Sequence, residues 1–205
     1  TAAAVLLQGL TAQYLVTDSS RPLPGQVALV HAAAGGVGLL LVQMLRAKGV
    51  LVIGVASSDV KRDAARRAGA DMVMGYDDLV ERVQDATEGA GVHVTYDSVG
   101  RTLDDSLAAT RTGGTVVFYG MAAGDPDPVD PRLLMDRSLT LTGGDLWNVL
   151  VSAEVRRQRS AELFELIRKG TLVPTIAGTF PLRDGAKAHA FLESRGAIGK
   201  VVMTL

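Results

Sequence analysis

The chain contains no cysteine, few aromatic residues and no excess of either charge. Without cysteine there are no disulfide bonds and no metal sites that use a thiolate. Aromatic residues are only 4% of the sequence and hydrophobic residues 47%, which predicts a mainly aliphatic core. The formal net charge is −1 and no basic stripe is present. The composition therefore disfavours nucleic acid as a partner, because such binding depends on neutralising phosphates.

Long apolar runs are also missing. The longest, such as residues 37–45, are too short to cross a bilayer, and no signal peptide is visible, so we expect a cytoplasmic protein that does not enter a membrane. The 205 residues suffice for one or two domains. Because Thr1 already stands in the apolar helical pattern TAAAVLLQGLTAQYLV, we expect that a longer chain precedes it.

Short β-type runs alternate with helical patterns as far as residue 142. Strands are predicted at residues 27–30, 51–55, 72–74, 92–96, 115–119 and 138–142. Helices are predicted at residues 37–48, 59–68, 79–86 and 103–110. This alternation predicts an α/β fold with a doubly wound, six-stranded parallel sheet. The continuous apolar strand LVIGV fits burial on both faces.

The rhythm changes after Gly144. The sequence predicts a longer helix at residues 152–169, extended chain at 171–182, a short helix at 184–194 and a last strand at 200–205. The segment Gly120–Pro131, rich in glycine, proline and aspartate, is expected to be irregular.

The stretch HAAAGGVG, residues 31–38, lies between the first strand and its helix. It carries the pattern Ala33-x-Gly35-x-x-Gly38, a variant of the dinucleotide-binding pattern with alanine in the first position. Gly35 would let the backbone approach a diphosphate, and Gly38 would let the helix pack close to the strand. The helix N-terminus would supply N–H groups and positive potential. A tight strand-to-helix turn without a ligand is the alternative.

The end of the second strand bears on the choice of cofactor. An NAD-binding domain usually has an acidic residue there to hold the ribose, but this strand ends in Ala-Ser-Ser. Ser57, Ser58 and Lys61 or Arg62 could instead receive a 2′-phosphate, because phosphate needs donors and positive charge. We therefore expect NADP(H). Asp59 is the alternative, since it could hold the ribose of NAD, although a carboxylate also suits the first turn of the next helix.

The fourth and fifth strands end in YDSVG and VVFYGMAAG. Ligands of open α/β sheets lie outside the carboxyl ends of the strands. The loops that follow these two strands contain few large side chains, and we therefore expect them to face the same crevice as the glycine loop.

Six motifs in order, HAAAGGVG, GVASSDVK, GADMVMGYDD, GVHVTYDSVG, GGTVVFYG and GKVVMTL, make the sequence resemble the zinc-independent quinone oxidoreductases. These are zeta-crystallin relatives within the medium-chain dehydrogenase/reductase superfamily. The resemblance implies a Rossmann domain set between segments of a GroES-like catalytic domain. Residues 1–172 would be the dinucleotide-binding domain, and residues 173–205 would return to a catalytic domain whose N-terminal part precedes Thr1.

The resemblance also implies roles for individual residues. Gly36 and Val37 would line the diphosphate, Ser57, Ser58 and Lys61 would meet the 2′-phosphate, and Tyr76 would flank the same phosphate or the adenine. Val99 would touch the adenosine half. The nicotinamide half would meet Tyr119, Gly120, Met121, Ala122, Asp145, Leu146 and one of Thr11 and Tyr14. At residues 142–147 the chain has TGGDLW, where relatives tend to carry an aromatic-plus-arginine or proline segment.

The implied activity is NADPH-dependent hydride transfer to a quinone or another conjugated carbonyl compound, performed by a homodimer. Alternatives are a non-catalytic NADP(H)-binding or redox-sensing module and an enoyl reductase acting on acyl thioesters. A short-chain dehydrogenase would need Tyr-x-x-x-Lys, and none of the four tyrosines is followed by lysine at that spacing. A methyltransferase would need an acidic residue at the tip of the second strand.

The sequence indicates no catalytic acid and no metal ligands. His31 stands at a strand end beside the glycine loop, where a structural role is expected, and His93 and His189 are expected to be surface or packing residues. Three scattered histidines without cysteine disfavour a metal site.

Overall fold

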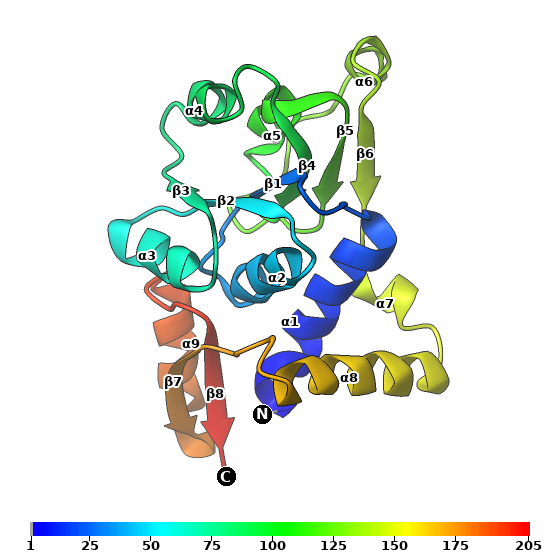
Figure 1. The fold of residues 1–205 in the computed structure, drawn as a ribbon. Helices are drawn as coiled ribbons and strands as arrows, with labels where there is room; N and C mark the ends of the chain where they lie inside the picture. Colours follow the sequence, from blue (N-terminus) through cyan, green and yellow to red (C-terminus); the bar gives the residue numbers. More distant parts are fainter. Residues whose placement is uncertain (1) are drawn as a thin grey trace.

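The computed structural model, which describes residues 2–205, is built around a six-stranded parallel sheet (Figure 1). Its strands are β1 (Val27–Val30), β2 (Leu51–Val55), β3 (Met72–Met74), β4 (Val92–Asp97), β5 (Thr110–Phe118) and β6 (Thr140–Gly143). The order is β3-β2-β1-β4-β5-β6, and every neighbouring pair is parallel. The predicted doubly wound sheet is confirmed, and its strand order reverses between β1 and β4, where such sheets bind ligands.

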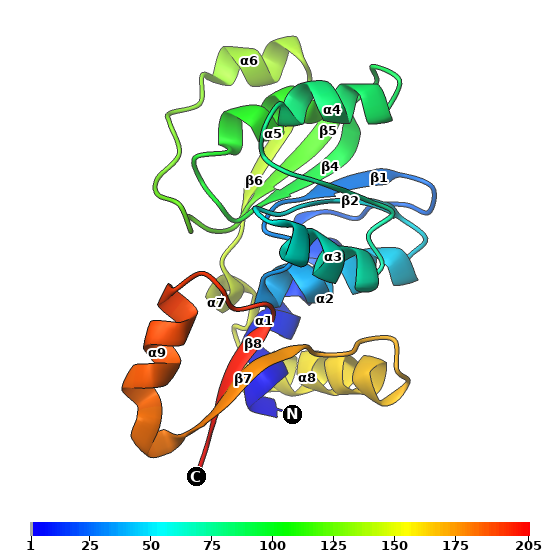
Figure 2. The same cartoon turned by 90° about the vertical axis from the view of Figure 1, so that its left-hand side faces the viewer.

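Helices cover both faces of this sheet, with α4 and α5 on one face and α2 and α3 on the other (Figures 1 and 2). Their bounds are α1 (Ala2–Tyr14), α2 (Gly36–Ala47), α3 (Asp59–Arg67), α4 (Leu79–Ala86) and α5 (Leu103–Ala109). The largest fully buried side chains are mostly Leu and Val, together with Tyr14, Tyr96 and His31. The core is therefore mainly aliphatic, as the composition predicts. No helix within residues 2–205 is long and apolar enough to span a membrane.

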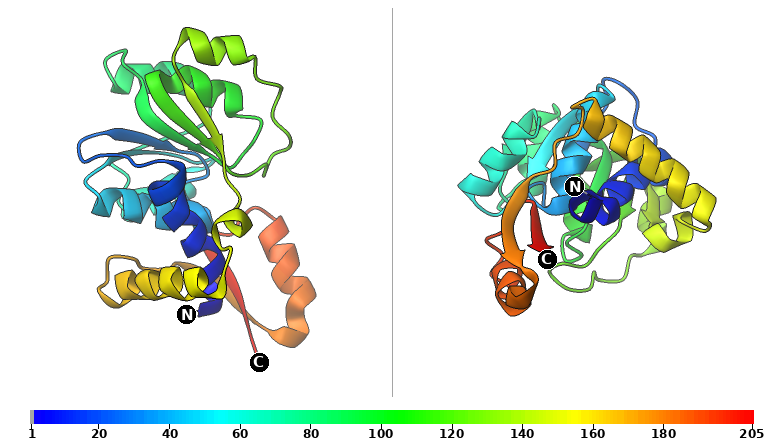
Figure 3. Two further views of the ribbon diagram at one scale, coloured as in Figure 1. Left: turned by 90° about the vertical axis from the view of Figure 1, so that its right-hand side faces the viewer. Right: turned by 90° about the horizontal axis from the view of Figure 1, so that it is seen from below.

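The C-terminal part forms a second, smaller sheet. Its elements are α8 (Ala153–Arg168), β7 (Ile176–Pro181), the 3-10 helix η2 (Leu182–Asp184), α9 (Gly185–Glu193) and β8 (Lys200–Thr204). β7 and β8 pair in parallel, outside the six-stranded sheet. Figure 3 shows this pair, with α9 beside it, at the end of the molecule opposite α4 and α5.

Several boundaries differ from those predicted. β5 begins at Thr110, which pairs with Val92 before a bulge. α6 (Pro131–Asp136) was not predicted; Asp130 Oδ1 accepts from the Arg132 N–H (2.8 Å) and starts it. Carbonyl groups of its last turn accept hydrogen bonds from the N–H groups of Ser138 and Leu139. These two residues therefore do not pair in the sheet, and β6 begins at Thr140. The first helix continues after Tyr14 as the π-helix η1 (Leu15–Ser19), and α7 (Leu146–Val149) was also unexpected. Thr1 lies outside the described residues.

A buried polar chain joins β1, β4 and α5. Ser106 Oγ donates to Asp97 Oδ2 (2.6 Å) and lies 3.0 Å from His31 Nε2. Asp97 also accepts from Thr102 Oγ1 and from the N–H groups of Val99 and Gly100 at 2.8–3.1 Å. Because the Ser106 proton goes to Asp97, His31 Nε2 must be the protonated nitrogen that donates to Ser106. His31 Nδ1 is then the unprotonated nitrogen, and it is buried without a partner among the described atoms.

The surroundings of His31 and Asp97 determine which of the two side chains is charged. Burial lowers the pKa of His31 below its ordinary value, although Asp97 and Asp105 act in the opposite direction. Burial opposes ionisation of Asp97, but hydrogen bonds from the Ser106 hydroxyl, the Val99 N–H and the Thr102 hydroxyl favour the carboxylate, and its pKa is also lowered. The result is a neutral imidazole bonded, through one hydroxyl, to an ionised carboxylate.

We predict that His31 makes stability depend on pH. Its folded pKa lies below the value of about 6.5 of an exposed histidine, so the unfolded chain takes up the proton first. The free energy of unfolding should be highest above about pH 7 and fall as the pH drops below about 6.5, by about 1.4 kcal/mol for each unit between the two pKa values. Urea denaturation between about pH 5 and 8 measures this slope.

His31→Asn removes the titrating group and should flatten that slope, even if it lowers the overall stability. His93→Gln is the matched control, because His93 is less deeply buried and its pKa is also lowered, by burial and Arg111. This control should retain most of the slope. An unchanged slope in His31→Asn would contradict the assignment.

Candidate functional site

The site begins at the turn between β1 and α2. Gly35 lies immediately before α2 and its N–H bonds to the Ala32 carbonyl (2.8 Å). A Cβ on Gly38 would collide with the Ala32 carbonyl and lie 2.8 Å from Ala33 Cα. The first helical turn therefore rests directly on loop backbone, as predicted for Gly38. Within residues 2–205, no acceptor receives the N–H groups of Val37 or Gly38.

Tyr76 holds the other side of this turn. Its hydroxyl accepts a hydrogen bond from the Ala32 N–H (3.1 Å), and its ring stacks on His31 with centroids 5.9 Å apart. Ala32 has φ = 47°, an unusual value for a residue with a side chain. Burial raises the pKa of Tyr76, so the hydroxyl stays protonated. The structure thus gives Tyr76 a loop-supporting contact that sequence reasoning missed.

A small cavity of about 120 Å³ opens between the glycine loop and the end of β2. It is lined by Ala32, Ala34, Gly35, Ala56, Ser57, Lys61, Tyr76 and Ala197. Ser57 and Lys61, predicted at the 2′-phosphate, and Tyr76, predicted at that phosphate or the adenine, therefore lie together. No carboxylate is among the lining residues.

The other polar residues near this cavity have partners elsewhere. Ser58 Oγ accepts from the Lys61 N–H (3.4 Å) at the start of α3. Arg62 donates to the Ala56 carbonyl (3.1 Å) and pairs with Asp59 (2.5 Å). The Asp59 side chain is 93% exposed and lies in the first turn of α3. Ser58, Arg62 and Asp59 thus do not line the cavity, whereas Ser57 and Lys61 do.

A larger cavity of about 770 Å³ lies on the other side of the loop, beyond the ends of β5 and β6. Its lining includes these residues expected at the nicotinamide half or the diphosphate: Thr11, Tyr14, Val37, Tyr119, Gly120, Met121, Asp145 and Leu146. Sequence reasoning missed the other lining residues: Leu7, Gln8, Phe118, Gly143, Gly144, Trp147 and Asn148. Val37, at the start of α2, connects this cavity to the glycine loop.

Val99 and Ala122 line neither cavity. The Ala122 N–H bonds to the Ser98 carbonyl (3.0 Å) and the Ala123 N–H to the Val99 carbonyl (2.9 Å). These bonds join the turns that follow β4 and β5. Both residues therefore hold the strand exits in place, rather than joining the residues that surround the cavities.

Tyr14 and Asp145 form the polar end of the larger cavity. Burial, with Asp145 nearby, raises the pKa of Tyr14 to about 12. Asp145 Oδ1 accepts from the Trp147 N–H (3.0 Å) and starts α7. A Cβ on Gly144 would lie 2.8 Å from the Tyr14 ring, which explains glycine in the divergent TGGDLW segment. Burial also raises the pKa of Tyr119, so both hydroxyls remain protonated near neutral pH.

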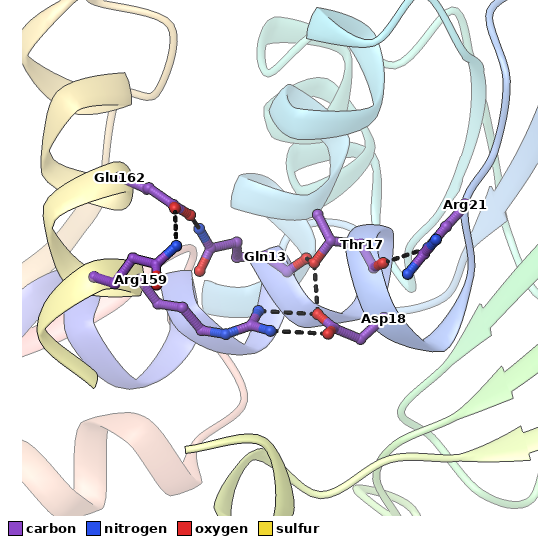
Figure 4. Close-up of polar contacts among 7 residues, drawn as sticks. Gln13, Thr17, Asp18, Arg21, Arg159 and Glu162 are labelled. Atoms are coloured by element: carbon purple, nitrogen blue, oxygen red, sulfur yellow. Dashed lines mark hydrogen bonds and ion pairs between the residues drawn. The ribbon is translucent and has the colours of Figure 1, made fainter. Parts of the chain in front are cut away.

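Helix α1, which carries Thr11 and Tyr14, and the π-helix η1 that continues it are fixed to α8 through polar contacts (Figure 4). Gln13 Nε2 donates to Glu162 (2.9 Å), and Arg159 binds Asp18 through two hydrogen bonds of 2.8 and 2.9 Å. The hydrogen bond from Arg159 lowers the pKa of Asp18. Two segments about 140 residues apart in the sequence thus set the position of one cavity wall.

The approach to β8 reaches the glycine loop itself. Gly199 forms a parallel bridge with Gly35, and its N–H bonds to the Ala34 carbonyl (3.2 Å). Gly199 has φ = 87°, and a Cβ there would lie 2.9 Å from the Thr175 Cβ. The neighbouring Ala197 therefore lines the small cavity, a contact that no local sequence signal indicated. Among the described residues, no group of three or more acidic or histidine side chains is placed to hold a metal ion.

The chain is similar in sequence to known proteins. The family model described as zinc-binding dehydrogenase matches residues 36–166. A probable quinone oxidoreductase of Schizosaccharomyces pombe is 41% identical over 98% of this chain and 62% of its own length. A 2-haloacrylate reductase of a Burkholderia species is 38% identical over the same shares. The chain thus spans about 62% of the length of these curated relatives.

The chain is also similar in structure to a solved protein. The quinone oxidoreductase of Escherichia coli complexed with NADPH superposes with a TM-score of 0.92 at 37% identity, covering 100% of this chain and 64% of that one. The matched segment of the family model contains the start of α2 and all of β2 to β6. The chain therefore belongs to the zinc-binding dehydrogenase family.

Proposed function

We propose that the intact protein is an NADPH-dependent oxidoreductase that transfers hydride to a quinone or another conjugated carbonyl compound. One observation carries this proposal: a helix start with two unpaired N–H groups, those of Val37 and Gly38, lies between a small and a larger cavity at the carboxyl edge of the sheet. This arrangement fits a dinucleotide, because the diphosphate would meet the start of α2 and each cavity would take one nucleoside.

The small cavity fits the adenosine half with a 2′-phosphate. Ser57 and Tyr76 offer hydroxyl groups, and Lys61 offers the positive charge that a phosphate needs. Asp59, the only feature that favoured NAD, is exposed and paired with Arg62. These observations support NADPH over NADH. The contact proposed between Val99 and the adenosine half rests on the family resemblance alone.

The larger cavity fits the nicotinamide half and a substrate. The bound cofactor would supply the hydride, and the protein's part is to orient the two reactants and exclude water. Tyr14 and Tyr119 keep their protons near neutral pH because burial raises their pKa values, so they act as hydrogen-bond donors. Gly120, Met121 and Leu146 provide a wall along the cavity.

The names of the relatives support the substrate class. A quinone and a 2-haloacrylate both contain a carbon–carbon double bond conjugated to a carbonyl group, and proteins named for each are similar to this chain. An acyl thioester with the same conjugation is the neighbouring possibility, and a non-catalytic NADP(H) sensor is the alternative without chemistry.

We also infer a division near residue 173 and assembly into a homodimer. The separate β7–β8 sheet supports the division into residues 1–172 and 173–205. The open edge of β6 supports a dimer. The exposed apolar side chains of Met135, Trp147 and Val151, on α6, α7 and the segment that follows, also support it.

We predict that the intact protein oxidises NADPH when a simple quinone is added. The loss of the absorbance of the reduced nicotinamide follows the reaction. A 2-haloacrylate and an enoyl thioester, tested in parallel, would rank the substrate class. Tight NADPH binding without turnover of any of the three would instead support the sensor.

Lys61→Ala should weaken NADPH binding about tenfold or more and leave NADH binding nearly unchanged, because a charge-assisted contact to phosphate is lost. Calorimetric titration with both cofactors measures the two dissociation constants. Arg62→Ala is the matched control: Arg62 is the next residue on α3, yet its guanidinium faces Asp59 and the Ala56 carbonyl. Equal losses for NADPH and NADH in Lys61→Ala would refute the 2′-phosphate assignment.

The dimer predicts a solution mass of twice the chain mass. Light scattering of the intact protein measures it, and Trp147→Glu should shift the mass toward the monomer, because a charge would enter an apolar interface. Exposed Val60, on α3 away from β6, provides a control: Val60→Glu should leave the mass unchanged. A monomeric mass for the wild type would reject the dimer.

A further inference from the structure

Gln8 is a side chain of the larger cavity for which the sequence motifs indicate no role. It lies on α1, near the position at which α2 begins. Its carboxamide covers the α-carbon of Gly36: a Cβ on Gly36 would overlap Oε1 and Nε2 of Gln8 and lie 2.5 Å from its Cδ. The glycine at position 36 therefore leaves the space that the Gln8 carboxamide occupies.

The carboxamide of Gln8 is incompletely bonded there. Its Oε1 is buried and has no hydrogen-bond partner in the described part of the chain. A buried acceptor without a donor is unfavourable. The N–H groups of Val37 and Gly38, which also lack acceptors, follow Gly36 directly. Donors and acceptors at this point are thus both left without partners.

The position of Gln8 indicates which part of a dinucleotide it would meet. It lines the cavity that contains Thr11, Tyr14 and Tyr119, and it is absent from the cavity that contains Ser57 and Lys61. Val37, at the start of α2, lines the same cavity as Gln8. A group that contacts both Gln8 and the start of α2 is therefore on the nicotinamide side of the diphosphate.

We propose that Gln8 is a cofactor-binding residue that moves off Gly36 and bridges the nicotinamide-side phosphate and the adjoining ribose; this rests on the proposed function. The amide Nε2 donates to a phosphate oxygen, and Oε1 accepts from a ribose hydroxyl. Glutamine suits this position because its one planar group carries both a donor and an acceptor. The bridge supplies the partner that Oε1 lacks.

Binding measurements on variants of the intact protein test this role. Gln8→Met keeps the length of the side chain and removes both hydrogen bonds, and it should weaken NADPH about tenfold. Gln8→Glu replaces the donor with a negative charge beside the diphosphate, so its loss should be larger and should shrink as salt is added. Calorimetric titration gives each dissociation constant, and thermal denaturation reports whether each variant is folded.

Binding of the fragment 2′,5′-ADP shows whether a Gln8 variant affects only the nicotinamide side of the site or the whole site. It carries the adenosine half of NADPH only, so both Gln8 variants should bind it as the wild type does. Lys61→Ala is the matched control with the opposite pattern, since it should weaken both 2′,5′-ADP and NADPH.

Three results would overturn the assignment of Gln8. NADPH binding that is unchanged or tighter in Gln8→Met would mean that the carboxamide merely covers Gly36. An equal loss of 2′,5′-ADP would mean that the variant disturbs the whole site. If the wild type binds 2′,5′-ADP but not NADPH, the nicotinamide-side contact is refuted, whereas failure to bind either ligand refutes the proposed function itself.

Discussion

The contact between Gly38 and the backbone of Ala32 and Ala33 constrains the whole site. Because no side chain separates them, the first turn of α2 lies against the loop that follows β1. That position places the unpaired N–H groups of Val37 and Gly38 at the carboxyl edge of the sheet, where the strand order reverses between β1 and β4. Any larger residue at position 38 would push the helix away from the sheet, and both cavities beside the loop would lose a shared wall.

The loop is stabilised from its buried side by a polar network. The Tyr76 hydroxyl holds the Ala32 N–H, and His31, under the Tyr76 ring, connects through Ser106 to Asp97. Asp97 in turn fixes the N–H groups of Val99 and Gly100 at the end of β4. One buried carboxylate thus orients two of the strand exits that surround the site. Pre-organisation of this kind reduces the conformational entropy that ligand binding would otherwise cost.

Periodicity and glycine spacing predict the sheet and the glycine loop well, because both depend on local chemistry. β1, β2 and β3 have the bounds that the sequence predicts. Local signals could not tell which of Ser57 and Ser58, or of Lys61 and Arg62, faces the site, because the two members of each pair are adjacent and have the same chemical character. The turn of α3 decides between them: Ser58 is used as a helix cap and Arg62 turns toward Asp59. Similarly, nothing near Gln8 or Ala197 in the sequence indicates a site, since their partners lie on distant segments.

The sequence by itself determined the parallel α/β sheet, the close turn at residues 31–38 and a crevice at the carboxyl edge of the strands. These features follow from side-chain size and hydrophobic period, which act over a few residues. Only the tertiary structure decided which polar groups face that crevice. Their directions depend on packing between α1 and α8, on the bridge between Gly35 and Gly199, and on buried bonds such as that between His31 and Ser106. Such contacts join residues far apart in the chain, so they exist only once the elements have packed together.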